Sequence, residues 1–274
     1  MATLNKTSQQ NAQAMSLERH EAKYMVHRSQ VPAIREFIRP FCAPDDNAPP
    51  GEFPEYIVTT LQIDSPGLAL YKMKDDDALN RFKLRIRTYG TDGRCPIFLE
   101  IKRKIKGVIV KGRVTIPANR YHGDMIRKLD PTLRFKSLKE ESNYIQFVRL
   151  TQELDAEPKA IIRYHRESYL GRNDAYSRLT FDRKLCYQPA RSWDVIPKHP
   201  RWYAMDSTMA QGWPFSGLIL ELKTFGDAPN WMVELTERFS LSRIGFCKYY
   251  TAMRLESLFM GMAYAEDGKS TGFL

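Results

Sequence analysis

Cationic and apolar side chains alternate along several short segments of the chain. In RFKLRIR (81–87), four Lys and Arg residues take the odd positions and three apolar residues take the even positions. Successive side chains of a β-strand point to opposite faces, so this segment predicts a strand with one apolar and one basic face. Like charges that follow one another along a strand repel each other. A folded protein that keeps them together therefore needs an anionic partner for that face.

The same alternation recurs in five other segments, and in four of them a carboxylate shares the basic face: HEAKY (20–24), PIFLEIKRKI (96–105), VIVKGRV (108–114), SRLTFDRKL (177–185) and LILELK (218–223). Two arrangements account for this repetition. Each basic face is either an ordinary solvated surface, because exposed strands often carry Lys and Arg, or the strands close into a barrel with a basic interior. In the second case helices would cover the apolar outer faces.

The basic interior is favoured because solvated faces normally mix charges, whereas these faces are overwhelmingly cationic. Many of the cations are Arg, whose planar guanidinium group makes bidentate contacts with phosphate. Enclosed cations are costly without counter-charges, and a polyphosphate chain would supply them. The few carboxylates would then hold a divalent cation, which prefers hard oxygen ligands.

The composition agrees with a polyanionic partner. The 274 residues include 42 Lys and Arg against 32 Asp and Glu, a net charge of +10. Such an excess suits nucleic acid, an acidic membrane surface or a phosphate-rich small molecule. Nucleic acid is disfavoured, because the basic faces lack interleaved aromatic residues on which bases could stack. The four cysteines have neither metal-site nor disulfide spacing, and no apolar run reaches the ~20 residues of a membrane span. We therefore expect a cytoplasmic protein without a membrane span.

Most of the chain predicts short strands, at YIVTTLQID, LALYKM and NRFKLRIRTYG and at the basic segments named above. Helices are predicted at SQVPAIREFIRPF (29–41), within residues 121–155 and over residues 230–260. We expect one α+β domain over residues 17–262, between a disordered tail at 1–16 and a flexible tail at 263–274. Its predicted fold is a closed, mainly antiparallel β-barrel with helices packed outside.

The chain resembles the VTC domain, the polyphosphate polymerase branch of the triphosphate tunnel metalloenzymes, which are related to the CYTH enzymes. The resemblance runs from about Glu18 to Arg254. It is carried by the order and spacing of HEAKYMV, LYKMKDDDALNRFKLRIRTYG, IFLEIKRKIKG, VKGR, YHRESY, SRLTFDRKL, LILELKT and CKYYTAMR. It implies the triphosphate tunnel fold. It also implies transfer of the γ-phosphate of ATP to a growing polyphosphate chain, with a divalent metal.

The alternation and the resemblance together assign the candidate site residues. Catalytic roles are expected for Arg85, Arg87, Arg166, Arg178, Lys223 and Lys248. Phosphate-binding roles are expected for Lys23, Lys74, Lys83, Lys102, Lys104, Lys111, Arg113, Tyr164, Lys184 and Tyr249. The metal ligands are expected among Glu221, Glu100 and Glu21, with Mn²⁺ as the first choice and Mg²⁺ as the alternative.

Two departures from the family pattern bear on activity. Cys247 stands where the family usually has Ser, and Lys74 stands where it usually has Arg. The expected ligands are ATP and inorganic polyphosphate, with no nucleic acid and no obligate protein partner. The alternatives are a tripolyphosphatase or nucleoside triphosphatase on the same tunnel, where water is the acceptor, and a non-catalytic polyphosphate-binding protein.

Overall fold

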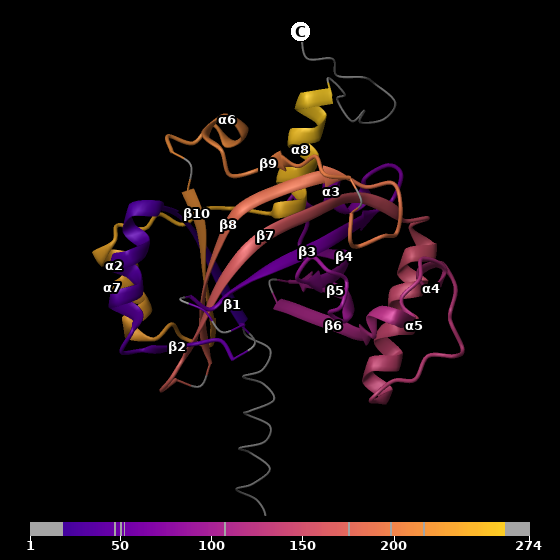
Figure 1. Ribbon diagram of the computed structural model, residues 1–274, viewed down its shortest axis with the longest axis horizontal. Helices are drawn as coiled ribbons and strands as arrows, with labels where there is room; N and C mark the ends of the chain where they lie inside the picture. Colours follow the sequence, from indigo (N-terminus) through magenta and orange to yellow (C-terminus); the bar gives the residue numbers. More distant parts are fainter. Residues whose placement is uncertain are drawn as a thin grey trace, which may run out of the picture.

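A large antiparallel sheet forms the centre of the molecule (Figure 1). The computed structural model describes residues 19–260, apart from residues 47, 50, 52, 107, 175, 198 and 216, so both predicted tails lie outside the described residues. Eight long strands of the described part follow the order β1-β10-β8-β7-β3-β4-β5-β6, and the short strands β2 and β9 pair with β7 and β8. The strands are β1 (Arg19–His27), β2 (Cys42–Pro44), β3 (Glu55–Asp64), β4 (Asn80–Tyr89), β5 (Ile97–Ile105), β6 (Val108–Ile116), β7 (Glu157–Gly171), β8 (Ser177–Pro189), β9 (Tyr203–Ala204) and β10 (Gly217–Phe225).

The sheet is open between its two end strands, β1 and β6. The predicted closed barrel is therefore not confirmed, although the mixed α+β class and the antiparallel pairing are. Strands that share a backbone ladder lie less than 5 Å apart. β1 and β6 are not paired in this way, and side chains bridge the gap between them. Lys102 Nζ of β5 lies 2.8 Å and Lys111 Nζ of β6 lies 3.3 Å from carboxylate oxygens of Glu21 on β1.

Helices cover the apolar outer faces of the strands (Figure 1). The 3₁₀ turns η1 (Arg28–Gln30) and η2 (Ala118–Arg120) and the short helix α6 (Thr208–Gln211) connect larger elements. Helices α2 (Val31–Ile38) and α7 (Asn230–Arg238) pack on β1, β8 and β10. Helices α4 (Asp124–Arg127) and α5 (Leu138–Glu153) pack on β4, β5 and β6. Helices α3 (Ala69–Asp75) and α8 (Lys248–Met260) lie at the end of the sheet where β3 ends and β7 begins.

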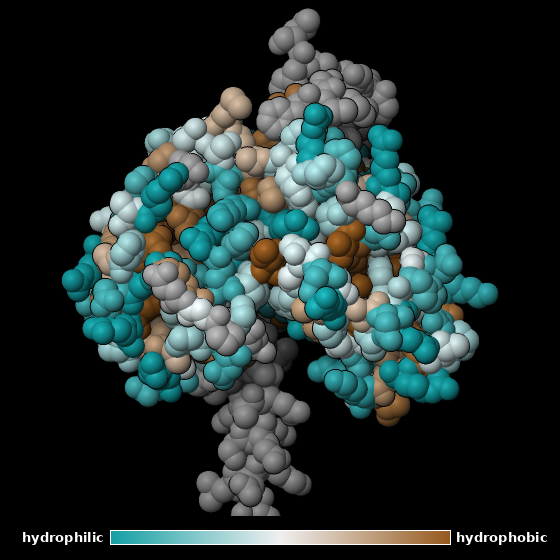
Figure 2. All heavy atoms as spheres, in the orientation of Figure 1, coloured by the Kyte–Doolittle hydropathy of each residue, from teal (hydrophilic) through white to brown (hydrophobic). Residues whose placement is uncertain are grey.

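The apolar half of each alternating segment explains this arrangement. Leu84 and Ile86 of β4 are 1% and 0% exposed and belong to the same apolar cluster as Phe147 of α5. Burying a side chain of this size contributes roughly 1.5–3 kcal/mol. Helices cover that face of the strands, and the side of the molecule seen in Figure 2 is mainly hydrophilic, with small apolar patches. None of the helices among the described residues is both long and apolar enough to cross a membrane.

The predicted strand at LALYKM is wrong, because these residues begin helix α3. The cause is the buried carboxylate of Asp64 at the end of β3, which accepts hydrogen bonds from the backbone N–H groups of Leu70 at 2.8 Å and Tyr71 at 2.9 Å. A carboxylate in this position satisfies amides that have no partner inside the helix. The other predicted strands and helices are found close to their expected positions.

Candidate functional site

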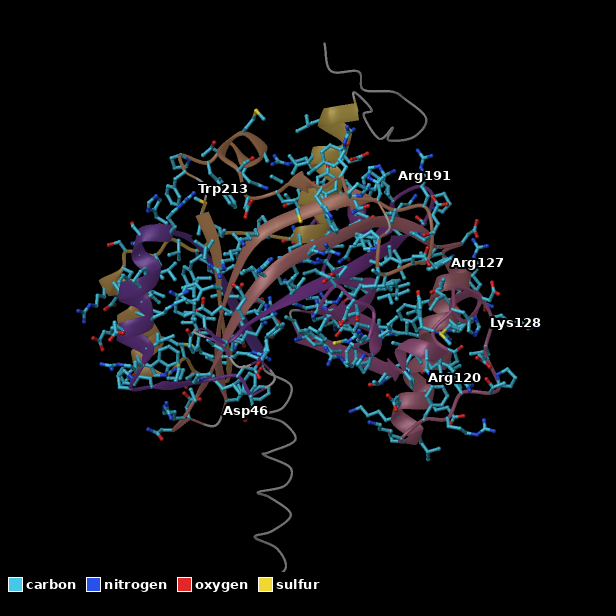
Figure 3. All side chains as sticks on the ribbon, viewed as in Figure 1. Asp46, Arg120, Arg127, Lys128, Arg191 and Trp213 are labelled. Carbon is cyan, nitrogen blue, oxygen red and sulfur yellow. The ribbon has the colours of Figure 1, made fainter. Side chains whose placement is uncertain are left out.

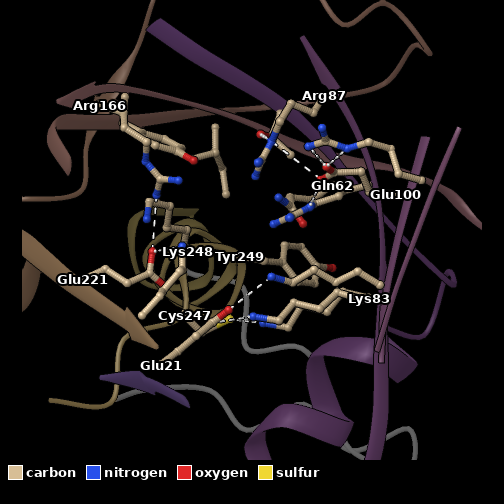
Figure 4. A pocket seen from close by; sticks show the side chains of 18 of the residues that line it. Glu21, Gln62, Lys83, Arg87, Glu100, Arg166, Glu221, Cys247, Lys248 and Tyr249 are labelled. Carbon is tan, nitrogen blue, oxygen red and sulfur yellow. Dashed lines mark hydrogen bonds and ion pairs between the residues drawn. The ribbon is translucent and has the colours of Figure 1, made fainter. Parts of the chain in front are cut away.

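The inner face of the curved sheet and the start of α8 enclose a cavity of about 400 Å³, the central cavity (Figure 4). Its lining comes from β1, β3, β4, β5, β6, β7, β8 and β10. Most of the predicted site residues line it: Glu21, Lys23, Lys83, Arg85, Arg87, Glu100, Lys102, Lys111, Arg113, Tyr164, Arg166, Arg178, Glu221, Lys223, Lys248 and Tyr249.

Three arginines of the central cavity surround one carboxylate. Arg85 Nε lies 2.6 Å and an Arg113 nitrogen 2.5 Å from oxygens of Glu100, with Arg87 at 3.7 Å. The register of β4, β5 and β6 places Arg85, Glu100 and Arg113 side by side. Burial alone would raise the pKa of Glu100, but the guanidinium groups hold it well below its usual range. Glu100 is therefore ionised and holds these arginines in a fixed arrangement on the cavity wall.

The opposite wall carries a second cluster around two carboxylates. Asp182 is fully buried. Its carboxylate accepts hydrogen bonds from Arg166 Nε and Arg166 Nη2, each at 2.7 Å, and from Lys248 Nζ at 2.6 Å. Glu221 lies 2.9 Å from Lys223 Nζ and 3.5 Å from Arg166 Nη2. Burial opposes ionisation of Asp182, yet Arg166 and Lys248 outweigh it and lower its pKa to about 2. The two acids thus position cations that point toward the cavity.

Glu21 and Glu221 are neighbours across the β1–β10 pair. Lys23 stands opposite Glu221 and Lys223 opposite Glu21, so the two glutamates are diagonal on the same face. Burial would raise the pKa of Glu21, but nearby lysines, first of all Lys102, lower it to about 2. Burial would also raise the pKa of Glu221, but Lys223 and Lys23 hold it well below its usual range. Both carboxylates are therefore ionised, and their hard oxygens are of the type that Mg²⁺ and Mn²⁺ prefer.

Among the residues that the structure describes, no group of three or more His, Cys, Asp or Glu side chains could hold a metal ion by itself. Magnesium-type ions commonly use one or two protein carboxylates and take their remaining ligands from water and substrate phosphates. Glu221 fits that mode best, since its ion pairs with Arg166 and Lys223 are both on Oε2. Glu21 would have to release Lys102 or Lys111, which bind its two oxygens. Glu100 fits it less well, because Arg85 and Arg113 already occupy its oxygens.

Three predicted residues lie outside the central cavity. Lys74 on α3 and Lys104 on β5 line a second cavity of about 340 Å³, which shares several lining residues with the first. Lys184 is exposed and lines neither. The expected position of Lys184 on the inner face is wrong because the pairing of β7 with β8 shifts beside it, and Lys184 adopts a left-handed φ of 51°. Such a bulge interrupts the two-residue alternation and turns the side chain outward.

Several lining residues were not predicted. Thr60 and Gln62 of β3 are uncharged, so the search for alternating cations passed over them. Tyr89 continues the odd positions of RFKLRIRTY, which was a usable signal. Cys247 was noted only as a departure from the family pattern, but its Sγ lies 2.7 Å from Lys83 Nζ inside the cavity. That distance depends on packing between α8 and β4, which a single sequence does not reveal.

The charge of the central cavity is strongly unbalanced. Among its described lining residues, eleven are Lys or Arg and three are Glu. Asp182 and Asp45, which pair with Arg166 and Arg178 behind the lining, do not offset the difference. Burial lowers the pKa of Lys102 to about 8 even though Glu21 favours its charged form. An enclosed surplus of cations is stabilised by an anion with many oxygens.

The antiparallel sheet and its cation-lined cavity define a protein suited to binding phosphate-rich anions. Residues 18–256 match the family model described as VTC domain, and the chain belongs to this family. No curated protein sequence matches the chain.

The matches among solved structures include two of low sequence identity. The PH1819 protein from Pyrococcus horikoshii OT3 shares 12% identity at a TM-score of 0.45, covering 88% of this chain and 99% of that one. The mimivirus capping enzyme triphosphatase shares 10% identity at a TM-score of 0.28, covering 86% of this chain and 96% of that one.

Proposed function

We propose that this protein is a polyphosphate polymerase, which transfers the γ-phosphate of ATP to the end of a polyphosphate chain. The observation that carries the proposal is the surplus of Lys and Arg enclosed by the inner face of the sheet. Family membership supports the same chemistry. The tripolyphosphatase alternative requires water as the acceptor, and the test below separates the two.

The cation clusters suit phosphoryl transfer. The reaction needs the reacting groups in line and stabilisation of charge on the transferred oxygens, with little covalent help from the protein. Arg85, Arg87 and Arg113 on one wall and Arg166 and Lys248 on the other would hold the triphosphate between them. A terminal phosphate oxygen of the acceptor attacks the γ-phosphorus, the bond to the β-phosphate oxygen breaks, and ADP leaves. Because the acceptor is already ionised, no strong general base is required.

A divalent metal would be held by Glu221 and Glu21, where it would neutralise charge on the phosphate oxygens. The second cavity favours polymerisation over simple hydrolysis. It adjoins the first through Glu21, Lys23, Lys83, Lys102 and Cys247. Its further lining includes Lys74, Arg81, Lys104 and Arg243. A polyanion longer than a triphosphate would find cations along both cavities.

The test is incubation with ATP and Mn²⁺, followed by gel separation of the products. Chains longer than three phosphates support polymerisation, orthophosphate alone supports the hydrolase, and no turnover supports a binder. Arg85→Ala should abolish the chains. Arg191→Ala is the matched control, since Arg191 is exposed and points away from the sheet (Figure 3). Equal loss in both variants would contradict the assignment of the cavity.

A further inference from the structure

Aromatic side chains gather where β4 ends beside the central cavity. The inner face of β4 runs Arg81, Lys83, Arg85, Arg87, Tyr89, so a tyrosine follows the line of cations. The Tyr89 ring centroid lies 5.6 Å from that of Tyr56 and 5.6 Å from that of Phe98, each edge to face at 71°. Tyr56 and Tyr89 both line the central cavity. These contacts hold two tyrosine rings in place beside Arg87.

A third tyrosine approaches from the opposite wall. Tyr176, in the connection between β7 and β8, lines the central cavity and packs on Phe225 at 4.4 Å between ring centroids. At the same end, Arg178 donates a hydrogen bond to the hydroxyl of Tyr56 at 3.3 Å. We call Tyr56, Tyr89 and Tyr176 the tyrosine mouth.

The second cavity differs in kind from this mouth. Its described lining contains no Tyr or Trp, and half of its lining residues are Lys or Arg. A bare polyanion needs cations alone, whereas a nucleotide also presents a flat base whose faces stack on aromatic rings. The tyrosine mouth therefore offers a surface that inorganic polyphosphate does not use.

We propose that the tyrosine mouth binds the base of a nucleoside triphosphate, with the triphosphate extending along β4 toward Arg87 and Arg85. This inference rests on the proposed function and names the part of the substrate that the cations do not explain. Tyr89 lies four residue steps along the strand from Arg85, a span of roughly 13 Å. The base thus stays at the tyrosine mouth while the phosphates lie between the cations of the central cavity. Stacking discriminates weakly among bases, so ATP and GTP bind with affinities within a few-fold of each other.

The test compares the affinities of ATP and inorganic tripolyphosphate for the full chain, with Mg²⁺ present. Tyr89→Ala should weaken ATP binding about tenfold, since the base loses a ring on which it stacks. Tripolyphosphate binding should weaken less than ATP binding in Tyr89→Ala, where the hydrogen bond between Tyr89 and Arg113 is also lost, and should stay within about twofold in Tyr176→Ala. Tyr89→Phe keeps the ring and should restore ATP binding. Tyr176→Ala, a change in a connection between strands, should show the same selective loss and guards against a folding defect in the first variant.

Each result bears on the proposal. Equal weakening of both ligands, or unchanged ATP binding in Tyr89→Ala and Tyr176→Ala, would overturn it, as would a wild type that binds tripolyphosphate but not ATP. Selective loss of ATP binding in a protein that forms no polyphosphate would uphold the base site and refute the polymerase. If the wild type forms polyphosphate and the tyrosine variants bind ATP normally, the polymerase is upheld and the base site is refuted.

Discussion

Replacement of Asp182 by Asn removes the buried carboxylate that holds Arg166 and Lys248. Breaking a buried ion pair by removing one partner typically costs about 3–5 kcal/mol, because the remaining charge is left unpaired. Arg166 and Lys248 keep 11% and 16% of their side-chain surface exposed, so water in the cavity solvates them in part. We therefore expect the lower end, a loss of about 3 kcal/mol in the free energy of unfolding at pH 7.

The pKa of Asp182 gives a separate check on this magnitude. Burial acts against the charged form, but Arg166 and Lys248 lower the pKa from 3.8 to about 2. A difference of this size corresponds to roughly 2 kcal/mol of stability. Because the folded-state pKa is depressed, this stability is present above about pH 4 and is lost as the pH falls toward 2. The difference between wild type and Asp182→Asn should shrink over that window.

Urea unfolding measures the effect, with Asp92→Asn as the control. Asp92 is 55% exposed and lies 3.7 Å from Arg94, so its replacement should change the unfolding free energy by less than about 0.5 kcal/mol. Tripolyphosphate at about 100 times its Kd should stabilise Asp182→Asn by about 2.7 kcal/mol, because the ligand binds the folded protein and not the unfolded chain. An Asp182→Asn protein as stable as the wild type would refute the reasoning.

Three further predictions concern charge and metal. Affinity for tripolyphosphate should fall as the pH rises through about 8, because Lys102, whose pKa is lowered to about 8 by burial, then loses its charge. Lys102→Arg keeps the charge and should remove much of that fall. The same pH profile of affinity in both proteins would contradict this prediction. Glu221→Gln should lose Mn²⁺-dependent turnover while binding tripolyphosphate without metal at least as tightly as the wild type, which calorimetry with and without chelator would measure. Lys184→Ala should leave affinity and turnover within about twofold of the wild type, and a tenfold loss would mean that this exposed lysine reaches the ligand.

The alternating segments made most of the sheet and of the cavity predictable. A period of two determines which face of a strand a side chain takes, so the placement of Arg85, Arg87 and Glu221 followed from their spacing. The prediction failed where a local feature interrupts that period, as at the β8 bulge beside Lys184. It also failed at α3, where a capping carboxylate from another segment decides the structure.

Contacts between segments far apart in the chain were less accessible. The pairing of Arg166 with Asp182 follows from strand neighbours, but the 2.7 Å contact between Lys83 and Cys247 depends on where α8 packs. The opening between β1 and β6 likewise depends on the curvature of the whole sheet, which alternation does not specify. Alternation identified the basic faces. Whether the sheet closes into a barrel could be decided only from the three-dimensional structure.

The proposed function depends on the binding of a chain of phosphates by the Lys and Arg residues of the central cavity. Calorimetric titration of inorganic tripolyphosphate into the wild type, Arg166→Ala and Arg94→Ala tests it most directly, because Arg166 lines the cavity and the Arg94 side chain is 89% exposed. We expect one site per chain, an affinity at least about tenfold weaker in Arg166→Ala, and no change in Arg94→Ala. No binding by the wild type, or equal weakening in both variants, would contradict the claim.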